Sequence, residues 1–438
     1  MTNATLSSPT ETIGLRLYRA ACRASGPIAR YALKRRLEKG KEDAERIDVR
    51  IGQPSAPRPD GLLVWIHGAS VGESLSVLPL VERLAEKRPG AHFLVTTGTV
   101  TSAKLMAERL PESATHQFIP LDHPDYVQRF LDHWKPDAAL FVESEFWPNL
   151  ISKARAQVDF MALVNGRVSP KSFESWTRRP HSIEYLLSSF DVIMGQDRQN
   201  AERLEKLSGR KVETFGNLKN AAPALPGAVD DVDALRKAIG DRPVWLAAST
   251  HPGEEEGVLE AHRLLAEKFP TIMTLLAPRH PERGNEVSAI AQELNLKAQL
   301  RSSERTPKPE TEIYIADTLG ELGLFYRLST ISFVGGGLTP KGGHNPLEPA
   351  RLGSAILHGP YTFNFVETYS EMRSGGGAAL VRNERELATA VRRLLSDEKT
   401  RLTMSSAARI AAEASAERVL TEVSEALLAH LKPSQIAA

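Results

Sequence analysis

The sequence is poor in cysteine, in long apolar runs and in net charge. Its one cysteine, Cys22, excludes an internal disulfide framework and a cysteine-based zinc site, and it suits a reducing compartment. No apolar run reaches the ~18 residues that span a bilayer. A formal net charge of +1 gives no reason to expect nucleic acid as a partner. The first residues, MTNATLSSPTETIG, lack the pattern of a secretory signal, so we expect a protein on the cytoplasmic side.

What is present is an alternation of short apolar runs with polar, helix-forming stretches. The runs LLVWIHG, HFLVTTG, AALFVES and FMALVNG are typical of strands in a parallel sheet that is covered on both faces. The segment NAAPALPGAVDDVD interrupts the alternation, which resumes at PVWLAAS. Because 438 residues are too many for one core, we expect an α/β fold of two doubly wound, Rossmann-like domains that face a central cleft.

Two further segments flank the predicted domains. An N-terminal basic segment precedes them, and a helix that is a candidate to fold back onto the first domain follows them. In chain order the four expected ranges are 1–50, 51–225, 226–415 and 416–438.

The N-terminal segment carries nine Lys or Arg and a single acid between Leu15 and Lys41. A solvated pair of basic helices is one interpretation. The other is an amphipathic segment that binds the anionic head groups of a membrane. For that second interpretation we expect Leu15, Leu17, Tyr18 and Tyr31 to add apolar contacts with the lipid.

The stretch WIHGASVGES, residues 65 to 74, runs from a strand into a possible helix start. Ser70 and Glu73 have the spacing of a capping box, in which each residue satisfies the other's backbone. Glu73 also occupies a strand end, where ligands of doubly wound folds bind, and a carboxylate suits a general base. Because one carboxylate does not serve both roles at once, we expect a catalytic Glu73 to break or lack the capping contact.

Other polar residues also follow predicted strands. The segment FVESEFWPN supplies Glu143 and Glu145, and FGNLKN supplies Lys219. The two acids mimic the Asp-x-Asp pattern by which some glycosyltransferases hold a divalent metal. In an enzyme with two domains we expect helix N-termini and basic side chains to neutralise the phosphate instead.

The second half contains a glycine-dense loop, FVGGGLTPKGG, followed by HNPLE. Glycines let backbone N–H groups approach an anion at a helix start. We expect Asn345 as the N-cap, Pro346 as the first helical residue and Glu348 as the third, with Glu348 free to accept from ribose hydroxyls.

The segment ADTLGEL is also expected to begin a helix that can bind an anion. Thr318 is the expected N-cap, and the backbone N–H groups that follow it are expected to be exposed. Arg279 would add a fixed cation for the same phosphate. The second domain is therefore predicted to bind a nucleotide. It has no P-loop and no Gly-x-Gly-x-x-Gly pattern to suggest ATP or NAD.

Seven blocks of the chain resemble, in order, those of the Kdo transferases of lipopolysaccharide synthesis. The blocks are HGASVGE, TTGTVTSAKLM, ESEFWPNL, NGRVSPKSF, APRHPER, DTLGELGLFY and GGGLTPKGGHNPLEPA, and the resemblance extends from about residue 13 to 425. These enzymes transfer 3-deoxy-D-manno-octulosonic acid (Kdo) from CMP-Kdo to a lipid A precursor, and they have the GT-B architecture. The resemblance implies an inverting transferase that needs no metal or other cofactor. It also implies that the enzyme acts on the cytoplasmic face of the inner membrane, where it would bind anionic lipids.

The resemblance also implies roles for individual residues. Glu73 matches the general base, and Glu143, Glu145 and Lys219 match groups that assist the transition state. The segments that match CMP-binding segments of the family are Pro278, Arg279, Gly320, Glu321, Leu322, Asn345, Pro346, Leu347 and Glu348. The N-terminal segment is less apolar than the anchor of many family members.

Two other functions are compatible with the predicted architecture. One is a GT-B enzyme that uses a UDP-sugar donor. The other is a non-enzymatic, two-domain ligand-binding protein of the periplasmic type, which would carry a signal sequence. The sequence does not indicate the oligomeric state or the number of Kdo residues that are added.

Overall fold

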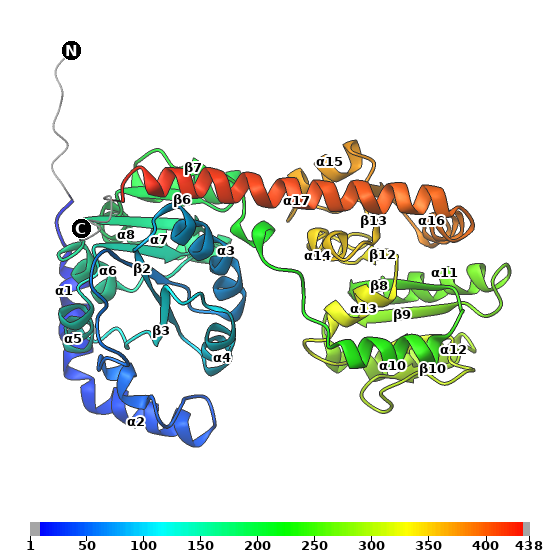
Figure 1. Cartoon of the computed structure of the whole chain (residues 1–438), viewed down its shortest axis with the longest axis horizontal. Helices are drawn as coiled ribbons and strands as arrows, with labels where there is room; N and C mark the ends of the chain where they lie inside the picture. Colours follow the sequence, from blue (N-terminus) through cyan, green and yellow to red (C-terminus); the bar gives the residue numbers. More distant parts are fainter. Residues whose placement is uncertain (1–8, 432–438) are drawn as a thin grey trace, which may run out of the picture. The chain divides into compact units, whose positions relative to one another are not determined.

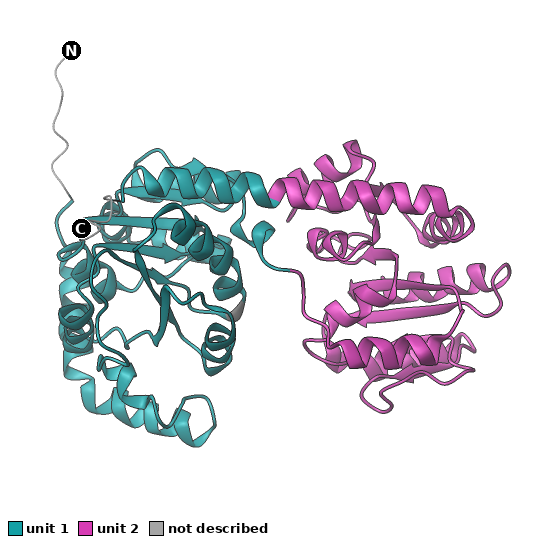
Figure 2. Cartoon of the chain, in the orientation of Figure 1, with its two compact units in different colours: residues 1–223, 416–438 teal, residues 224–415 magenta. Residues whose placement is uncertain are grey.

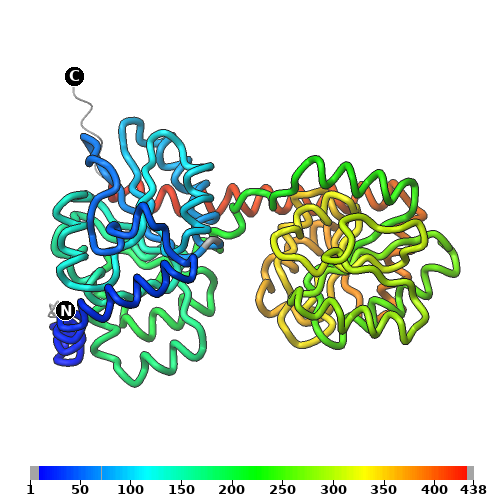
Figure 3. Tube along the Cα trace, turned by 90° about the horizontal axis from the view of Figure 1, so that it is seen from below, coloured from blue at the N-terminus to red at the C-terminus, as the bar shows by residue number. Residues whose placement is uncertain are grey.

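The chain divides into two compact units. The computed structural model describes residues 9–431, so residues 1–8 and 432–438 of the expected terminal segments lie outside the described residues. Unit 1 comprises Met1–Pro223 and Ala416–Ala438, and unit 2 comprises Ala224–Ser415 (Figure 2). The chain leaves unit 1 after Pro223, where we expected a boundary after residue 225. It returns to unit 1 within the long helix α17, the red helix of Figure 3.

Unit 1 contains a seven-stranded parallel sheet with the order β3-β2-β1-β4-β5-β6-β7 (Figure 1). Trp65 of β1 pairs in register with Leu94 of β2 on one side and with Ala139 of β4 on the other. The strands are β1 (Leu63–His67), β2 (His92–Thr97), β3 (Ala114–Phe118), β4 (Ala138–Val142), β5 (Phe160–Gly166), β6 (Val192–Gly195) and β7 (Glu213–Thr214).

Helices cover both faces of this sheet, and the side chains of β1 alternate between two cores. Leu63 and Trp65 pack with α1, α5, α6, α8 and α9, whereas Val64 and Ile66 pack with α3, α4, η2 and α17. This alternation explains the continuous apolar run of the strand, because both faces are buried. The helices of this unit are α1 (Ile13–Ala24), α2 (Gly26–Glu38), η1 (Ile47–Ile51), α3 (Val71–Lys87), α4 (Val100–Arg109), α5 (Pro124–Trp134), α6 (Pro148–Arg155), α7 (Pro170–Thr177), α8 (Pro180–Ser188), α9 (Arg198–Ser208), η2 (Leu218–Ala221) and the last part of α17 (Glu398–Leu428).

Unit 2 repeats the same plan. Its parallel sheet has the order β10-β11-β9-β8-β12-β13-β14, so the prediction of two doubly wound α/β units is confirmed. The strands are β8 (Val244–Thr250), β9 (Met273–Pro278), β10 (Ala298–Leu300), β11 (Ile313–Ile315), β12 (Ile331–Val334), β13 (Ala355–His358) and β14 (Ala378–Leu380). The helices are α10 (Val229–Ile239), α11 (Glu255–Ala266), η3 (Pro281–Arg283), α12 (Gly284–Glu293), α13 (Leu322–Leu328), α14 (Leu347–Arg351), α15 (Val366–Ser374), α16 (Glu384–Ser396) and the first part of α17.

The basic N-terminal segment forms α1 and α2, the dark blue helices of unit 1 in Figure 3. The expectation that Leu15 and Tyr18 face lipid is wrong. Leu15 is buried against α5 and α6, and Tyr18 donates a hydrogen bond to Asp122 at 3.0 Å. Leu17 and Tyr31 are exposed, as expected. No helix in the part of the chain that the structure describes is long and apolar enough to cross a membrane.

Asp122 joins α1 to the start of α6. Its carboxylate accepts from the backbone N–H groups of Leu150 at 2.7 Å and Asn149 at 3.2 Å, in addition to the Tyr18 hydroxyl. It therefore supplies the cap that Trp147, the N-cap residue of α6, does not provide. The segment that it holds follows Glu143 and Glu145 directly. Burial raises the pKa of Asp122 to about 6, although these hydrogen bonds act in the opposite direction.

This raised pKa predicts how the stability of unit 1 depends on pH. The folded chain holds the Asp122 proton more tightly than the unfolded chain, whose carboxyl titrates near 3.8. The contribution of Asp122 is therefore full below pH ~4 and falls as the pH rises to ~6, by up to about 3 kcal/mol. We expect Asp122→Asn to remove this fall. Urea unfolding followed by tryptophan fluorescence measures it, because four of the five tryptophans (Trp65, Trp134, Trp147 and Trp176) lie in unit 1.

The matched control is Asp60→Asn, because Asp60 is an exposed acid of the same unit. It should keep the pH dependence of the wild type. Equal slopes for the wild type and Asp122→Asn between pH 4 and 6 would contradict the prediction.

Candidate functional site

Each sheet reverses its strand order at one point. In unit 1 the reversal lies between β1 and β4, and in unit 2 it lies between β8 and β12. Ligands of such sheets bind outside the carboxyl ends of the strands at this point. The loops after β1, β4, β8 and β12 are therefore the candidate sites. The predicted residues Glu73, Glu143, Glu145 and Asn345–Glu348 follow three of these strands.

Glu73 lies in the first turn of α3, shortly after β1, and it forms a variant of the capping box in which the Ala69 N–H replaces the Ser70 N–H as the backbone donor. Its Oε1 accepts from Ser70 Oγ and its Oε2 from the Ala69 N–H, both at 2.7 Å, while its own N–H donates to Ser70 Oγ at 3.3 Å. The capping contact is therefore present, which contradicts the expectation that Glu73 lacks it, whereas the breaking of this contact during catalysis stays a prediction. A carboxylate has about four acceptor positions, of which the cap uses two. The half-buried side chain thus keeps acceptor capacity for a substrate hydroxyl.

Glu143 follows β4, and its buried carboxylate forms an ion pair with Lys219 Nζ. Its φ of +61° lies in the left-handed region, which non-glycine residues adopt rarely and often at functional sites. Lys219 comes from η2, which is held by the side chain of Asn165 through a 3.0 Å hydrogen bond from the Leu218 N–H. A Cβ on Gly72 would lie 4.0 Å from Lys219 Cε. The ion pair therefore lies beside the start of α3, where Glu73 is found.

Glu145 has other partners. Its Oε2 lies 3.6 Å from His67 Nε2 and accepts from Trp147 Nε1 at 2.5 Å. The His67 Nδ1 faces Thr96, so Nε2 is the nitrogen that turns toward Glu145. Burial acts to raise the pKa of Glu145, but His67 and Trp147 outweigh burial and hold the pKa below its usual range. Of the two acids, Glu143 is thus the one that pairs with Lys219, a distinction that the sequence left open.

In unit 2, Arg279 follows β9, which ends at Pro278. The Arg279 N–H donates to Thr250 O at 2.9 Å, and this bond ties the ends of β8 and β9 together. Its positive charge acts to lower the pKa of His344 and of Glu348. The Arg279 side chain is exposed, and its charge acts on His344 in the loop after β12 and on Glu348 in α14. Arg279 therefore belongs to one cluster with the start of α14, and its role toward a phosphate stays a prediction.

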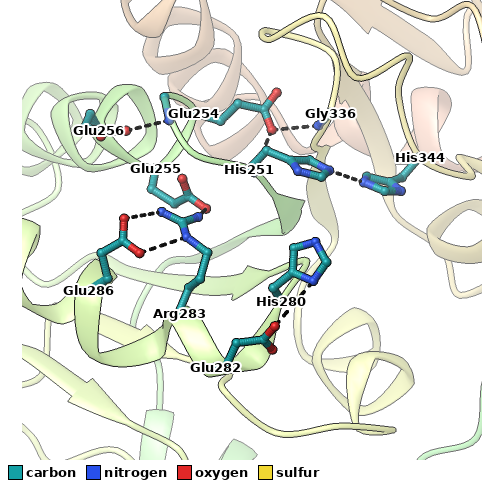
Figure 4. Close-up of polar contacts among 11 residues, drawn as sticks. His251, Glu254, Glu255, Glu256, His280, Glu282, Arg283, Glu286, Gly336 and His344 are labelled. Atoms are coloured by element: carbon teal, nitrogen blue, oxygen red, sulfur yellow. Dashed lines mark hydrogen bonds and ion pairs between the residues drawn. The ribbon is translucent and has the colours of Figure 1, made fainter.

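The glycine-dense loop after β12 binds an internal carboxylate. Glu254, the N-cap residue of α11, is fully buried and accepts from four backbone N–H groups, of which Figure 4 shows those of His251 and Gly336. They belong to His251 at 3.0 Å, Gly336 at 2.6 Å, Leu338 at 2.8 Å and Thr339 at 3.4 Å. The expectation that the amides of this loop approach a ligand anion is therefore wrong for these three loop residues. Glu254 was absent from the predicted site, although the run HPGEEE directly after a strand was a usable signal.

The next two acids of that run, Glu255 and Glu256, lie in the first turn of α11. Glu255 is buried and pairs with Arg283 Nη1 at 2.6 Å, and Arg283 also reaches Glu286 at 2.8 Å (Figure 4). Burial raises the pKa of Glu255, and Arg283 opposes that effect. Glu256 accepts from the Gly253 N–H at 3.1 Å. The three acids at the start of α11 thus bind the turn before the helix, the loop after β12 and Arg283.

The segment Gly320–Leu322 differs from the expectation. Helix α13 begins at Leu322 with Glu321 as its N-cap residue, whereas Thr318 was expected. Thr318 instead donates through its hydroxyl to the Glu321 carboxylate. Glu321 pairs with the buried Arg301 at 2.8 and 3.1 Å, and this pairing holds the pKa of Glu321 below its usual range. Its side chain anchors the loop, and a ligand role for the segment stays a prediction.

The start of α14 is shifted by one residue from the expected position. Its N-cap residue is Pro346, and the expected one was Asn345. Asn345 still caps the helix, because its Oδ1 accepts from the Leu347 N–H at 3.1 Å and its Nδ2 donates to Glu348 Oε1 at 3.4 Å. Burial raises the pKa of Glu348, while Asn345 and Arg279 oppose that effect.

Two other features of the described chain concern ligands. A groove of about 890 Å³ in unit 2 is lined by β14, α16 and the first turns of α17, and it contains none of the predicted site residues. Within residues 9–431, no group of three or more His, Cys, Asp or Glu side chains is arranged to hold a metal ion. Activity without a metal stays a prediction.

Comparison with known proteins identifies the family to which the chain belongs. Residues 45–222 match the family model described as 3-deoxy-D-manno-octulosonic-acid transferase (kdotransferase). A 3-deoxy-D-manno-octulosonic acid transferase of Rickettsia bellii is 35% identical over 368 residues, which cover 84% of this chain and 87% of that protein. The enzyme of the same name from Haemophilus influenzae is 35% identical over 356 residues, which cover 80% and 82%.

A solved structure supports the fold alone. A glycosyltransferase from Rickettsia africae superposes with a TM-score of 0.59 at 12% identity and covers 85% of this chain and 100% of that one. The two parallel seven-stranded sheets thus form a GT-B-like fold. Given the identity and coverage of the Rickettsia bellii and Haemophilus influenzae enzymes, the chain is a glycosyltransferase that belongs to the 3-deoxy-D-manno-octulosonic acid transferase family.

Proposed function

We propose that the protein transfers Kdo from CMP-Kdo to a lipid A precursor, with inversion at the anomeric carbon and without a metal or other cofactor. The observation that carries the proposal is membership of the Kdo transferase family, at 35% identity over most of the chain. The arrangement of Glu73, Glu143 and Lys219 at the reversal point of unit 1 supports it.

Glu73 acts as the general base in this proposal. The acceptor hydroxyl oxygen attacks the anomeric carbon of Kdo, and its proton passes to the Glu73 carboxylate. The bond between the anomeric carbon and the phosphate oxygen breaks, and CMP leaves with that electron pair. The hydrogen bonds from Ser70 and Ala69 fix the carboxylate in one orientation before the substrate arrives, which is what a positioned base requires.

The ion pair of Glu143 and Lys219 supplies a fixed charge beside this base. Glu143 is buried, and its charge is compensated by Lys219. The pair keeps the ammonium group of Lys219 near the start of α3, where it can stabilise negative charge in the transition state. Glu145, held by His67 and Trp147, orients the same loop.

The nucleotide binds to unit 2 in this proposal. Arg279 provides a cation for the phosphate, and Glu348 at the start of α14 accepts from ribose hydroxyls. Asn345 orients Glu348 through their 3.4 Å hydrogen bond. Because a CMP-sugar carries a single phosphate, side-chain cations are sufficient to neutralise it.

We also propose that α1 and α2 hold the protein on the cytoplasmic face of the inner membrane. Four large apolar side chains of these helices are exposed: Ile13 by 75%, Leu17 by 66%, Ile28 by 70% and Tyr31 by 63%. Exposed cations lie among them, including Lys34 and Arg35 of α2. Apolar side chains interleaved with cations are typical of segments that bind anionic lipid surfaces.

Substitution of the base tests the mechanism. Glu73→Gln keeps an oxygen that accepts from the Ala69 N–H and an NH2 group that can donate to Ser70 Oγ, but it cannot take a proton at neutral pH. We expect transfer to fall by ~10²-fold or more, with CMP affinity unchanged. Transfer is measured with CMP-Kdo and a tetraacyl lipid A precursor, followed by mass spectrometry of the lipid. Glu82→Gln, at an exposed position on the same helix, is the control. Near-normal turnover of Glu73→Gln would return Glu73 to a purely capping role.

Substitution of the donor-site cation tests the nucleotide site. We expect Arg279→Ala to weaken CMP binding by about 1.5–3 kcal/mol, because a hydrogen bond to a charged group is lost. Calorimetric titration with CMP in EDTA measures both this loss and the independence from metal. Arg263→Ala, in an exposed ion pair of unit 2, should bind normally. CMP binding or transfer that vanishes in EDTA and returns with magnesium or manganese would contradict the proposal.

Substitution of exposed apolar residues tests the membrane surface. Deletion of α1 would also remove Leu15 and Tyr18 from the fold, so point substitutions are preferable. We expect the double variant Leu17→Ser, Ile28→Ser to sediment less with anionic liposomes, and wild-type binding to fall with salt. Leu402→Ser, at a residue of unit 2 that is 54% exposed, is the control. Equal sedimentation of the double variant and the wild type would place the lipid-binding surface elsewhere.

A further inference from the structure

Two imidazoles meet at the reversal point of unit 2. His251 lies in the loop after β8, and His344 lies in the loop between β12 and α14. Their ring planes are within 6° of parallel, and their Nε2 atoms are 2.9 Å apart (Figure 4). This geometry is an end-to-end N–H···N hydrogen bond. A single proton lies between the rings, because two N–H groups cannot face each other at this distance.

The position of both rings is fixed by the surrounding backbone. The His251 N–H donates to Glu254, and Glu254 also accepts from Gly336. The His344 N–H donates to Gly335 O at 3.1 Å. A Cβ on Gly336 would lie 3.1 Å from His344 Cδ2, so a glycine at this point leaves room for the ring. The backbone of the two loops therefore holds the two rings in this arrangement.

The hydrogen bond limits the protons that the pair can hold. In the neutral pair, one ring donates through Nε2 and so has a bare, basic Nδ1. One more proton at that Nδ1 gives a pair with a single positive charge. Two positive charges would place N–H against N–H. The pair thus has one neutral and one singly charged state.

Charged and titratable groups face the pair from several elements. They are Arg279 and His280 after β9, Lys341 in the glycine-dense loop and Glu254 at the start of α11. Burial, followed by nearby positive charge, lowers the pKa of His344 to about 4 and also lowers that of His251, where Glu254 acts in the opposite direction. The free protein therefore holds the pair neutral at pH 7.

The carboxylate of Glu254 is already fully hydrogen-bonded and is not free to bind a cation of this cluster. It is fully buried and is bound by four backbone N–H groups, which also removes those N–H groups as donors for a ligand. A ligand anion at this point would therefore be met by side chains: Arg279, Lys341 and the imidazole pair. An anion also favours the charged state of the pair, because opposite charges attract strongly where water is excluded.

We propose that the His251–His344 pair takes up one proton when the phosphate of CMP binds, and that the charged pair then contacts this phosphate. The proposal rests on the proposed function, because it assigns the nucleotide to unit 2. The same contact serves the transfer step. When the bond from the anomeric carbon to the phosphate oxygen breaks, the electron pair stays on the phosphate, whose charge rises from one to two negative. The charged pair donates a hydrogen bond to this oxygen.

Calorimetric titration of the full chain with CMP tests the proposal. Titration at pH 7.5 in HEPES and in Tris, which differ in their enthalpy of ionisation, gives the number of protons taken up. CMP contributes few of them, because a phosphate monoester loses its second proton with a pKa of about 6. For the wild type we expect close to one proton, and a dissociation constant that rises toward tenfold per pH unit above neutrality.

Variants of the pair and of a neighbour complete the test. His344→Gln and His251→Gln should bind CMP about tenfold to a hundredfold more weakly and take up almost no proton. His280→Gln, whose ring lies 6.1 Å from that of His251 but outside the pair, should keep the uptake.

The outcomes separate the inference from the function on which it rests. A wild type that binds CMP without proton uptake, or a folded His344→Gln that keeps the full uptake, overturns the inference and leaves the proposed function intact. A wild type that does not bind CMP overturns the assignment of the donor. Should the variants fail to fold, the uptake and pH dependence of the wild type still decide the question.

Discussion

Buried carboxylates bound by backbone N–H groups organise the carboxyl edge of each sheet. In a parallel sheet every loop that carries chemistry leaves from this edge, where helix starts leave N–H groups without partners. Asp122 satisfies two such groups at the start of α6, and Glu254 satisfies four across two loops of unit 2. A buried charge of this kind is tolerated only when it is fully hydrogen-bonded, so the loops and the acids stabilise one another. The segment after Glu145 and the loop before His344 are held in this way.

The same interaction makes capping compatible with the proposed catalysis. The cap orients Glu73 and leaves acceptor positions on the same carboxylate, so the structural contact does not exclude the proposed chemical role. Glu254 is the opposite case, because four donors use its whole acceptor capacity and burial closes it to any ligand. The number of donors and the exposure of the carboxylate therefore distinguish an acid that can act on a substrate from one that only supports a loop.

The sequence predicted the fold better than it predicted individual contacts. Strand ends are visible in apolar runs, and polar residues that follow them are brought together by the topology of any doubly wound sheet. The sequence missed contacts between distant segments, such as Glu254 with Gly336, 82 residues apart. Helix starts moved by one residue at Asn345 and by three at Thr318. Local spacing cannot distinguish such shifts, because neighbouring residues share capping ability. Leu15 and Tyr18 were assigned to lipid because a helical pattern does not say which apolar face packs on a neighbouring helix.

These contacts change the chemistry that is expected of the nucleotide site. A glycine-dense loop suggests recognition of phosphate by backbone amides, whose charge does not depend on pH. Here three of those amides are bound by Glu254, so in the proposed site Arg279, Lys341 and a pair of imidazoles recognise the phosphate instead. Arginine and lysine stay charged at neutral pH, whereas the imidazole pair can be neutral in the free protein and charged in the complex. A site built in this way binds its anion most tightly as negative charge accumulates, which is the change that the leaving phosphate undergoes during transfer.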